Sequence, residues 1–270
     1  MLKREIQNIF ECEKIKYAEA IPYSLTKRNE SCKKTAEFSP NSAVVFLIPY
    51  FNGVNDGNVS VYAQAKDYHL YCKELEKRIV PVFEEITNEK AALFADTSPI
   101  YEVDAALTAG LGVKGKNGLL INREYSSFVF IASLLTTAKT DALTDKKDYA
   151  VSECINCGRC KENCPVNLDK SKCISSITQK KGQLSDDEIT ALKNQAYVWG
   201  CDVCQLVCPY TEKMIKNGTK TEIEFFKTDI VSNVTLKYLE NISKKDFEKR
   251  AFSWRGKKVL SRNIGICEEK

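Results

Sequence analysis

Eight of the twelve cysteines in the chain lie in one stretch, between Cys154 and Cys208. The N-terminus lacks the apolar segment of a secretory signal, and the longest apolar run, residues 43–48, is too short to span a bilayer. We therefore expect a cytoplasmic protein with no membrane contact, whose thiols stay reduced. Ligation of a metal or a metal cluster, rather than a disulfide framework, is then the expected role of the eight cysteines. The other four are interpreted as free thiols: Cys12, Cys32, Cys72 and Cys267.

The spacing of the clustered cysteines narrows the kind of site. The first four follow Cys-x2-Cys-x2-Cys-x3-Cys-Pro, the run by which bacterial ferredoxins hold two 4Fe-4S clusters. A second run, Cys-x2-Cys-x3-Cys-Pro, is one ligand shorter, and Cys173 supplies the missing thiolate. In such sites the last cysteine of the run reaches the neighbouring cluster. We therefore assign to the first cluster Cys154, Cys157, Cys160 and Cys208. To the second cluster we assign Cys164, Cys173, Cys201 and Cys204.

Zinc is an alternative, because paired Cys-x2-Cys segments also bind this metal through four thiolates. The Cys-Pro endings and the three-cysteine spacing have no role in a zinc site, which favours clusters. Two clusters in one small module can pass electrons singly, and we interpret the module as an electron-delivery unit. Clusters with a purely structural role are the other alternative.

The residues before the cysteines alternate between strand and helix patterns. Apolar runs predict strands at 43–48, 91–95, 119–121 and 128–135, although the last could be a buried helix. Apolar positions at helical spacing predict a helix over 75–86, with Pro81 as a kink or a break. A second helix is expected to start at 96–99, with a hydroxyl N-cap and Pro99 at its first position, and to end at Gly110. This alternation predicts an α/β layered domain.

After a polar linker at 139–148 the strand patterns stop. Short helices and loops are expected over 150–210, including a helix that begins at Ser185, and the remainder is expected to be helical. The predicted fold class is α+β, in three parts. These are an α/β layered cofactor or substrate domain at 1–145, a mostly helical ferredoxin-like module for two 4Fe-4S clusters at 146–215, and a helical basic tail at 216–270.

The net charge of +4 is concentrated in the tail. Eight Lys or Arg residues stand there against two Asp or Glu residues, a local charge of +6 between Lys244 and Arg262. The stretch could contact phosphates, or it could be an ordinary solvated basic helix. Its basic residues are Lys244, Lys245, Lys249, Arg250, Arg255, Lys257, Lys258 and Arg262.

Gly110, Gly112 and Gly115 satisfy the G-x-G-x-x-G pattern of dinucleotide sites. The pattern follows a predicted helix and leads into a predicted strand, whereas a dinucleotide site needs the reverse order, so we reject a Rossmann site. Two interpretations remain: a loop whose backbone approaches another large cofactor, and an ordinary turn.

Four segments taken together resemble the epoxyqueuosine reductase family: 67–69, 96–102, 110–122 and 200–209. The resemblance runs from about Val44 to Arg262. It implies that the N-terminal domain binds cobalamin, which the nearer of two 4Fe-4S clusters reduces to cob(I)alamin. It also implies reductive deoxygenation of an epoxide on a modified tRNA nucleoside, with Asp96 as the proton donor. The residues that match cofactor-side positions are Asp67, Tyr68, His69, Gly110, Gly112, Gly115, Lys116 and Asn117.

Taken on their own, these residues have simpler interpretations. Asp96 could cap a turn or a helix, His69 could be an ordinary helical histidine, and Tyr68 could be a core aromatic residue. The chain also departs from the family, because Val103 stands where the family has Arg and Val113-Lys114 stands where it has Trp-Ile.

The segment between Ile21 and Ala43 is short, and the helical repeats with which the family grips tRNA do not follow Arg262. We therefore expect weak tRNA binding through Lys244–Arg262, or a smaller nucleoside substrate. The expected electron donor is a ferredoxin or a flavodoxin. A second function remains open: a two-cluster electron carrier without cobalamin that docks on a partner reductase.

Overall fold

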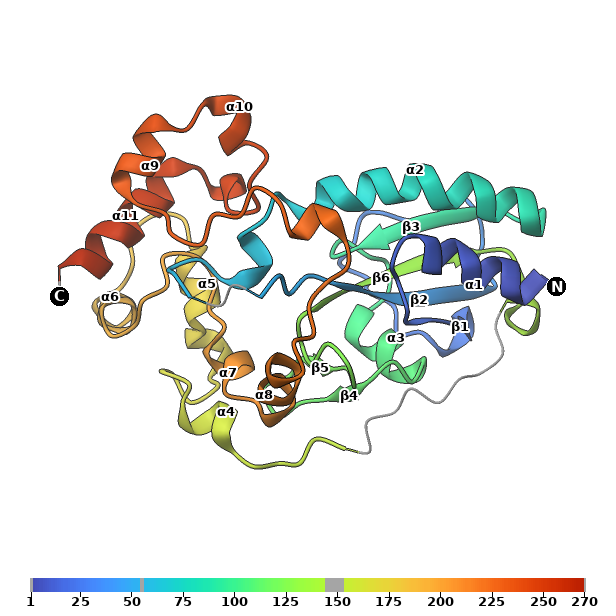
Figure 1. Ribbon diagram of the computed structural model, residues 1–270, viewed down its shortest axis with the longest axis horizontal. Coiled ribbons are helices and arrows are strands. Elements are labelled where there is room, and N and C mark those ends of the chain that lie inside the picture. The colour runs from blue at the N-terminus through green and yellow to red at the C-terminus, as the bar shows by residue number, and fades with distance from the viewer. Residues whose placement is uncertain (1, 54–55, 144–152, 270) are drawn as a thin grey trace. The chain divides into compact units, whose positions relative to one another are not determined.

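The computed structural model describes residues 2–53, 56–143 and 153–269 (Figure 1). The chain divides into two compact units, and each is made of two separate stretches of sequence. The first comprises Met1–Pro49 and Tyr71–Asn156, and the second comprises Tyr50–Leu70 and Cys157–Lys270. The predicted boundary between residues 145 and 146, with most of the polar linker, lies outside the described residues. None of the described helices has the length and apolar character needed to cross a bilayer.

The first unit is built on a four-stranded sheet in the order β1-β2-β6-β3. Its strands are β1 (Ala18–Pro22), β2 (Ser42–Pro49), β3 (Ala91–Ala95) and β6 (Val129–Thr136). Every neighbouring pair is antiparallel. Since β2 and β3 both run opposite to β6, they are parallel to each other, and α2 (Tyr68–Thr87) connects them. The unit therefore contains a β-α-β crossover whose two strands are separated by an antiparallel strand.

Helices cover both faces of this sheet, which explains why every residue of β2 is buried. Figure 1 shows α1 (Leu2–Cys12) and α2 on one face and α3 (Glu102–Thr108) on the other. On the first face the rings of Phe10 and Phe46 lie 5.0 Å apart. On the second, Val45 and Leu47 pack with Ala105 and Ala106 of α3. The strands predicted at 43–48, 91–95 and 128–135 are confirmed, whereas α1 and β1 have no counterpart in the sequence-based assignment.

Of the two expectations for Pro81, a kink or a break, the break is wrong, because α2 continues through this residue to Thr87. Pro81 is exposed, so its ring projects into solvent. On the opposite side, buried residues before and after the proline hold both halves of the helix against the sheet, and these contacts offset the lost backbone hydrogen bond. They are Tyr71, Cys72, Leu75, Ile79 and Phe83.

The helix expected to start at residues 96–99 begins later, at Glu102. Ser98 does not cap it: its hydroxyl accepts a hydrogen bond from the Ile100 N–H (3.4 Å), which holds an extended turn. The sequence resembles an N-cap because serine–proline patterns occur at turns as well as at helix starts. The strand predicted at 119–121 forms β5 (Leu120–Ile121), which pairs with β4 (Val113–Lys114) in a separate hairpin.

The second unit is helical within its described residues. Its helices are α4 (Arg159–Glu162), α5 (Ile174–Thr178), α6 (Asp186–Lys193), α7 (Val203–Leu206), α8 (Pro209–Lys216), α9 (Leu236–Asn241), α10 (Lys244–Phe247) and α11 (Lys257–Glu268). The helix start predicted at Ser185 is confirmed, with a complete capping box to Glu188. Together, the sheet of the first unit and the helices of both units make a mixed α/β fold with a small antiparallel sheet.

The C-terminal helices form part of the core of this unit. Phe252, Leu260 and Ile264 are buried with Trp199 and Val59 in one hydrophobic cluster. Asn263 of α11 is buried, and its Nδ2 donates to the carbonyl oxygens of Thr178 (2.8 Å) and Val198 (2.9 Å). The stretch expected to be a tail thus closes the unit that contains most of the cysteines.

Candidate functional site

None of the clustered cysteines forms a disulfide; Cys157 is exposed, and the other seven are half-buried. Cys154 belongs to the first unit, and the remaining seven belong to the second. Among the described residues, no three His, Cys, Asp or Glu side chains converge on a position for a single metal ion. The assignment of cysteines to individual clusters therefore stays a prediction.

Three of the four thiols assigned to the second cluster are electrostatic neighbours. Burial raises the pKa of Cys201 to about 12, and the nearby Cys204 and Cys173 add to this effect. Cys173 stands at the junction of a 3-10 turn, Lys170–Lys172, and α5. The turn and α5 therefore bring Cys173, which belongs to neither cysteine run, close to Cys201 and Cys204 of the second run.

Arg159 lies close to two thiols that we assign to the first cluster. Its guanidinium interacts electrostatically with Cys157 and Cys208 as well as with Glu212. The ion pair to the Glu212 carboxylate joins α4 to α8. Since α8 begins directly after Cys208, with Pro209 in its first turn, this pair orients the end of the second run relative to the first.

Asp202, between two predicted ligands, anchors the second cysteine run. Its carboxylate is 1% exposed and accepts hydrogen bonds from the Ser60 hydroxyl (2.6 Å), the Val61 N–H (2.7 Å) and the Gln205 side chain (3.0 Å). Burial raises its pKa to about 6. Gly200 permits the approach, because a Cβ there would lie 2.4 Å from the Cβ of Ser60. The sequence does not reveal this role, because Ser60 is 142 positions away from Asp202. Its one signal is an acidic residue inside a cysteine run.

The segment Asp67-Tyr68-His69 starts α2. Asp67 Oδ1 accepts hydrogen bonds from the His69 N–H and lies 2.9 Å from His69 Nδ1, so Asp67 caps the helix. The rings of Tyr68 and His69 stack with centroids 4.2 Å apart. This segment belongs to the second unit, whereas Asp96 and the glycine loop belong to the first.

Asp96 is exposed at the end of β3 and adopts a left-handed backbone conformation (φ 62°). Its N–H donates to Glu102 Oε1 (2.7 Å), so the first residue of α3 holds the turn. Non-glycine residues in this conformation are uncommon and occur often at functional sites.

The glycine loop runs from α3 into the β4–β5 hairpin, as the sequence predicted. Two of its glycines are required by the chain's own packing: a Cβ on Gly112 would lie 2.4 Å from the Ile121 carbonyl oxygen, and one on Gly115 would lie 2.6 Å from Asn117 Oδ1. Gly110 has open space around it and a positive φ. Lys116 is exposed and Asn117 half-buried, whereas Gly112 and Gly115 are buried.

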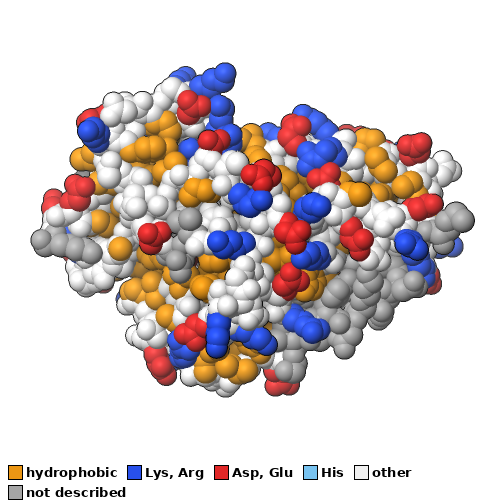
Figure 2. All heavy atoms as spheres, viewed as in Figure 1, with side chains coloured by type: hydrophobic (Ala, Val, Ile, Leu, Met, Phe, Trp, Pro, Cys, Tyr) orange, Lys and Arg blue, Asp and Glu red, His pale blue; other side chains and the backbone are white. Residues whose placement is uncertain are grey.

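Most basic residues of Lys244–Arg262 are engaged within the second unit. Arg262 donates to the carbonyl oxygens of Lys180 and Gly182, and Lys257 to those of Leu239 and Ile242. Four further basic side chains have one kind of partner each. Arg250 donates to backbone carbonyl oxygens, and Arg255 lies on the Trp254 ring. Lys249 pairs with Asp246, and Lys244 pairs with Glu248. Lys245 and Lys258 are the two with no contact of this kind among the described residues. On the face drawn in Figure 2, basic and acidic side chains are interspersed.

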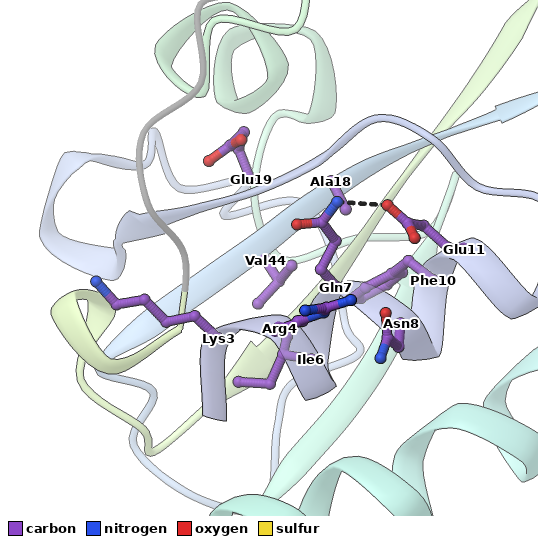
Figure 3. Close-up of a pocket in the computed structure, with 10 residues that line it drawn as sticks. All are labelled: Lys3, Arg4, Ile6, Gln7, Asn8, Phe10, Glu11, Ala18, Glu19 and Val44. Atoms are coloured by element: carbon purple, nitrogen blue, oxygen red, sulfur yellow. Dashed lines mark hydrogen bonds between the residues drawn. The ribbon is translucent and has the colours of Figure 1, made fainter. Parts of the chain in front are cut away.

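Two pockets lie away from the predicted catalytic residue. One, of about 390 Å³, lies in the first unit between α1 and the edge of the sheet, beside Gln7, which donates to Glu11 (Figure 3). The other, of about 460 Å³, lies in the second unit and includes Ser171, Ile177 and Arg255. Among the described residues, neither Asp96 nor any predicted cofactor or cluster residue lines either pocket, whereas Arg255 of the basic stretch lines the second.

Residues 153–211 match the family described as the 4Fe-4S double cluster binding domain, and this range contains all eight predicted cluster ligands. An epoxyqueuosine reductase of Leadbetterella byssophila is 32% identical over 225 residues, which are 78% of this chain and 70% of that protein. The chain spans 50 to 60% of the length of the first curated relatives that it matches, all of them epoxyqueuosine reductases.

Solved structures of epoxyqueuosine reductases share the fold. One, bound to an epoxyqueuosine-modified tRNA-Tyr stem loop, has a TM-score of 0.78 at 21% identity, over 99% of this chain and 81% of that one. Another, from Bacillus subtilis, with its catalytic aspartate loop swung out of the active site, has a TM-score of 0.78 at 20% identity, over 99% and 82%.

Proposed function

The chain belongs to the epoxyqueuosine reductase family, and from that premise we propose that it removes the epoxide oxygen of a modified tRNA nucleoside by reduction. Two electrons and two protons convert an epoxide to an alkene and water. One combined observation carries this proposal. The cysteine segment matches a double-cluster domain, and the chain that contains it has the fold of epoxyqueuosine reductases. A ferredoxin or flavodoxin is the proposed donor, and the cytoplasm, where such carriers and tRNA occur, is the proposed location.

The cysteine segment fits two 4Fe-4S clusters in number and kind of donor, since each cubane takes four thiolates and eight are available. The neighbourhood of Cys173, Cys201 and Cys204 supports the proposed second ligand set, completed by Cys164. The position of Arg159 beside Cys157 and Cys208 supports the first, completed by Cys154 and Cys160.

Epoxyqueuosine reductases also use cobalamin, which when bound supplies the electrons that break the carbon–oxygen bond. The described residues fit this cofactor in part. Gly110, Lys116 and Asn117 lie at the accessible part of the glycine loop and are proposed to contact it. Gly112 and Gly115 are proposed to act indirectly, by allowing the hairpin to close. Asp67 is proposed to act with Tyr68 and His69 by fixing the start of α2, where Tyr68 and His69 are half-exposed.

Asp96 is proposed to donate a proton to the oxygen that leaves the epoxide carbon. The carboxyl group is exposed, and the turn that carries it is held by Glu102 and by further backbone hydrogen bonds of the residues that follow. A turn held in this way limits where the carboxyl group can lie relative to a substrate. The solved Bacillus subtilis relative has a catalytic aspartate loop, and Asp96 is proposed to be the corresponding residue of this chain.

Anaerobic reconstitution with iron, sulfide and cobalamin tests the proposal. We expect a corrinoid absorption band that stays with the protein through gel filtration, and conversion of an epoxyqueuosine-bearing stem loop to the alkene, detected by mass spectrometry. Clusters without retained corrinoid would instead support the electron-carrier alternative. Retained corrinoid without conversion of the stem loop would direct the search to a smaller nucleoside substrate.

A further inference from the structure

A basic segment pairs with the residues that follow Asp96 and carries exposed cations. Residues 27–34 contain four basic side chains and one acidic side chain, Glu30. The basic side chains are all exposed and, within the described residues, form no ion pair with a carboxylate: Lys27, Arg28, Lys33 and Lys34. In Lys244–Arg262, by contrast, Lys244 and Lys249 form ion pairs with carboxylates.

The backbone of this segment is paired with the residues that follow Asp96. Arg28 and Ile100 form an antiparallel bridge, the Asn29 N–H donates to the Pro99 carbonyl (2.8 Å), and the Tyr101 N–H donates to the Lys27 carbonyl (2.9 Å). Asn29 Nδ2 also donates to the Ser98 carbonyl (3.1 Å). The backbone of Lys27 and Arg28 is therefore fixed to the residues that directly follow the proposed proton donor.

Each of the two cations lies on an aromatic ring. The Arg28 guanidinium is 3.3 Å from the centroid of Tyr23, and its Nη1 donates to the Thr26 hydroxyl (2.5 Å). Lys27 Nζ is 4.9 Å from the centroid of Tyr101, whose side chain is 42% exposed. Stacking fixes the plane of a guanidinium for bidentate contact with a phosphate. An exposed tyrosine beside such cations offers a surface on which an unpaired base can stack.

We propose that Lys27 and Arg28 bind phosphates of the RNA loop that carries the reacting nucleoside, and that Tyr101 stacks on a base of that loop. This inference rests on the proposed function and changes the site of RNA contact from the C-terminal helices to the segment that holds the Asp96 turn. Single-stranded loops suit this surface, because their bases are free to leave the stack.

Fluorescence anisotropy with a labelled, unmodified tRNA-Tyr anticodon stem loop tests the proposal on the full chain with its clusters. Lys27→Ala/Arg28→Ala should weaken binding on the order of tenfold at low salt and reduce the log–log salt slope by about 1.4, or about 0.7 for each single-strand phosphate contact. Tyr101→Ala should weaken binding roughly 5- to 150-fold, the effect of losing one stacked base, and leave the salt slope unchanged.

Lys245→Ala/Lys258→Ala is the matched control, since it removes the same charge from exposed, unengaged positions of the C-terminal stretch. It should leave affinity and salt slope unchanged. Loss of affinity in this control, with none in Lys27→Ala/Arg28→Ala, would overturn the inference and restore the C-terminal surface. If the unaltered protein converts substrate while all three variants bind RNA as it does, the inference fails and the proposed function stands. If the unaltered protein binds no RNA, tRNA fails as the substrate together with the inference.

Discussion

At the scale of single residues, two positions singled out from the sequence have different physical roles. Asp96 occupies a left-handed turn that exposes its carboxyl group, which accords with the proposed chemistry. Gly112 is buried against the backbone of its own hairpin, so its lack of a side chain serves folding. The sequence motifs point to catalysis for Asp96 and to the cofactor for Gly112, and only the contacts in the structure distinguish the two roles.

Asp96→Asn should lower turnover by on the order of 10² to 10⁴, the usual contribution of a positioned acid, because an amide cannot supply the proton. Iron content and corrinoid retention should not change. Single-turnover conversion of the stem loop measures the effect. Asp104→Asn, in the first turn of α3, removes a carboxyl group of the same unit and should leave turnover intact. Equal rates for the Asp96→Asn variant and the original protein would show that Asp96 serves the turn alone.

Gly112→Ala should destabilise the first unit by about 1–3 kcal/mol, because the new Cβ must move the Ile121 carbonyl from 2.4 Å to an ordinary contact distance. Urea unfolding followed by circular dichroism measures the change. Gly265→Ala is the control, since this helical glycine has open space around it and alanine favours a helix by about 1 kcal/mol. A Gly112→Ala protein as stable as the original would mean that the hairpin can shift freely.

At the scale of elements, the sequence predicts which segments form strands and helices better than it predicts how these elements are arranged. The sequence located β2, α2, β3 and β6, yet β6 inserts between β2 and β3 and runs against both. Apolar runs look alike in parallel and antiparallel strands when both faces are buried. Similarly, the sequence allows a solvated basic helix in this part of the chain, but Val259, Leu260, Asn263 and Ile264 of α11 are buried.

Asn263→Ala should therefore cost about 1–3 kcal/mol of stability, because it leaves the buried carbonyls of Thr178 and Val198 without a donor. Asn241→Ala provides a comparison, since the Asn241 side chain donates to the Lys237 carbonyl at an exposed position and its loss should cost little. Thermal unfolding of both variants, each with its clusters intact, measures the difference. Similar melting temperatures would show that α11 contributes little to the core.

At the scale of the whole molecule, two compact units divide the proposed functions. The sheet unit holds the proposed proton donor and the glycine loop, and the helical unit holds seven of the eight predicted ligands. The segment 50–70 joins the helical unit through Ser60 and Asp202, so the cysteine runs are fixed to residues from the N-terminal half of the chain.

Anaerobically purified protein should contain about eight iron and eight sulfide per chain, two cubanes of four each. Cys173→Ser should remove about half of both and leave one cluster visible by electron paramagnetic resonance. Cys267→Ser, at a half-buried cysteine outside the runs, should leave the content unchanged. Zinc in place of iron, or four iron in the unaltered protein, would contradict the two-cluster assignment.

The sequence by itself determined the cysteine chemistry, the family and the main strands, because ligand spacing and buried apolar runs are local properties. It also located Asp96 at the end of a strand. Only the tertiary structure decided that Asp202 bonds to Ser60, that Gly112 meets Ile121, that the basic side chains of the C-terminal helices are engaged, and that residues 27–29 pair with the turn after Asp96. Most of these contacts join residues from distant parts of the chain, and the contact of Gly112 depends on how its hairpin closes. Such packing is set by the whole fold rather than by neighbouring residues alone.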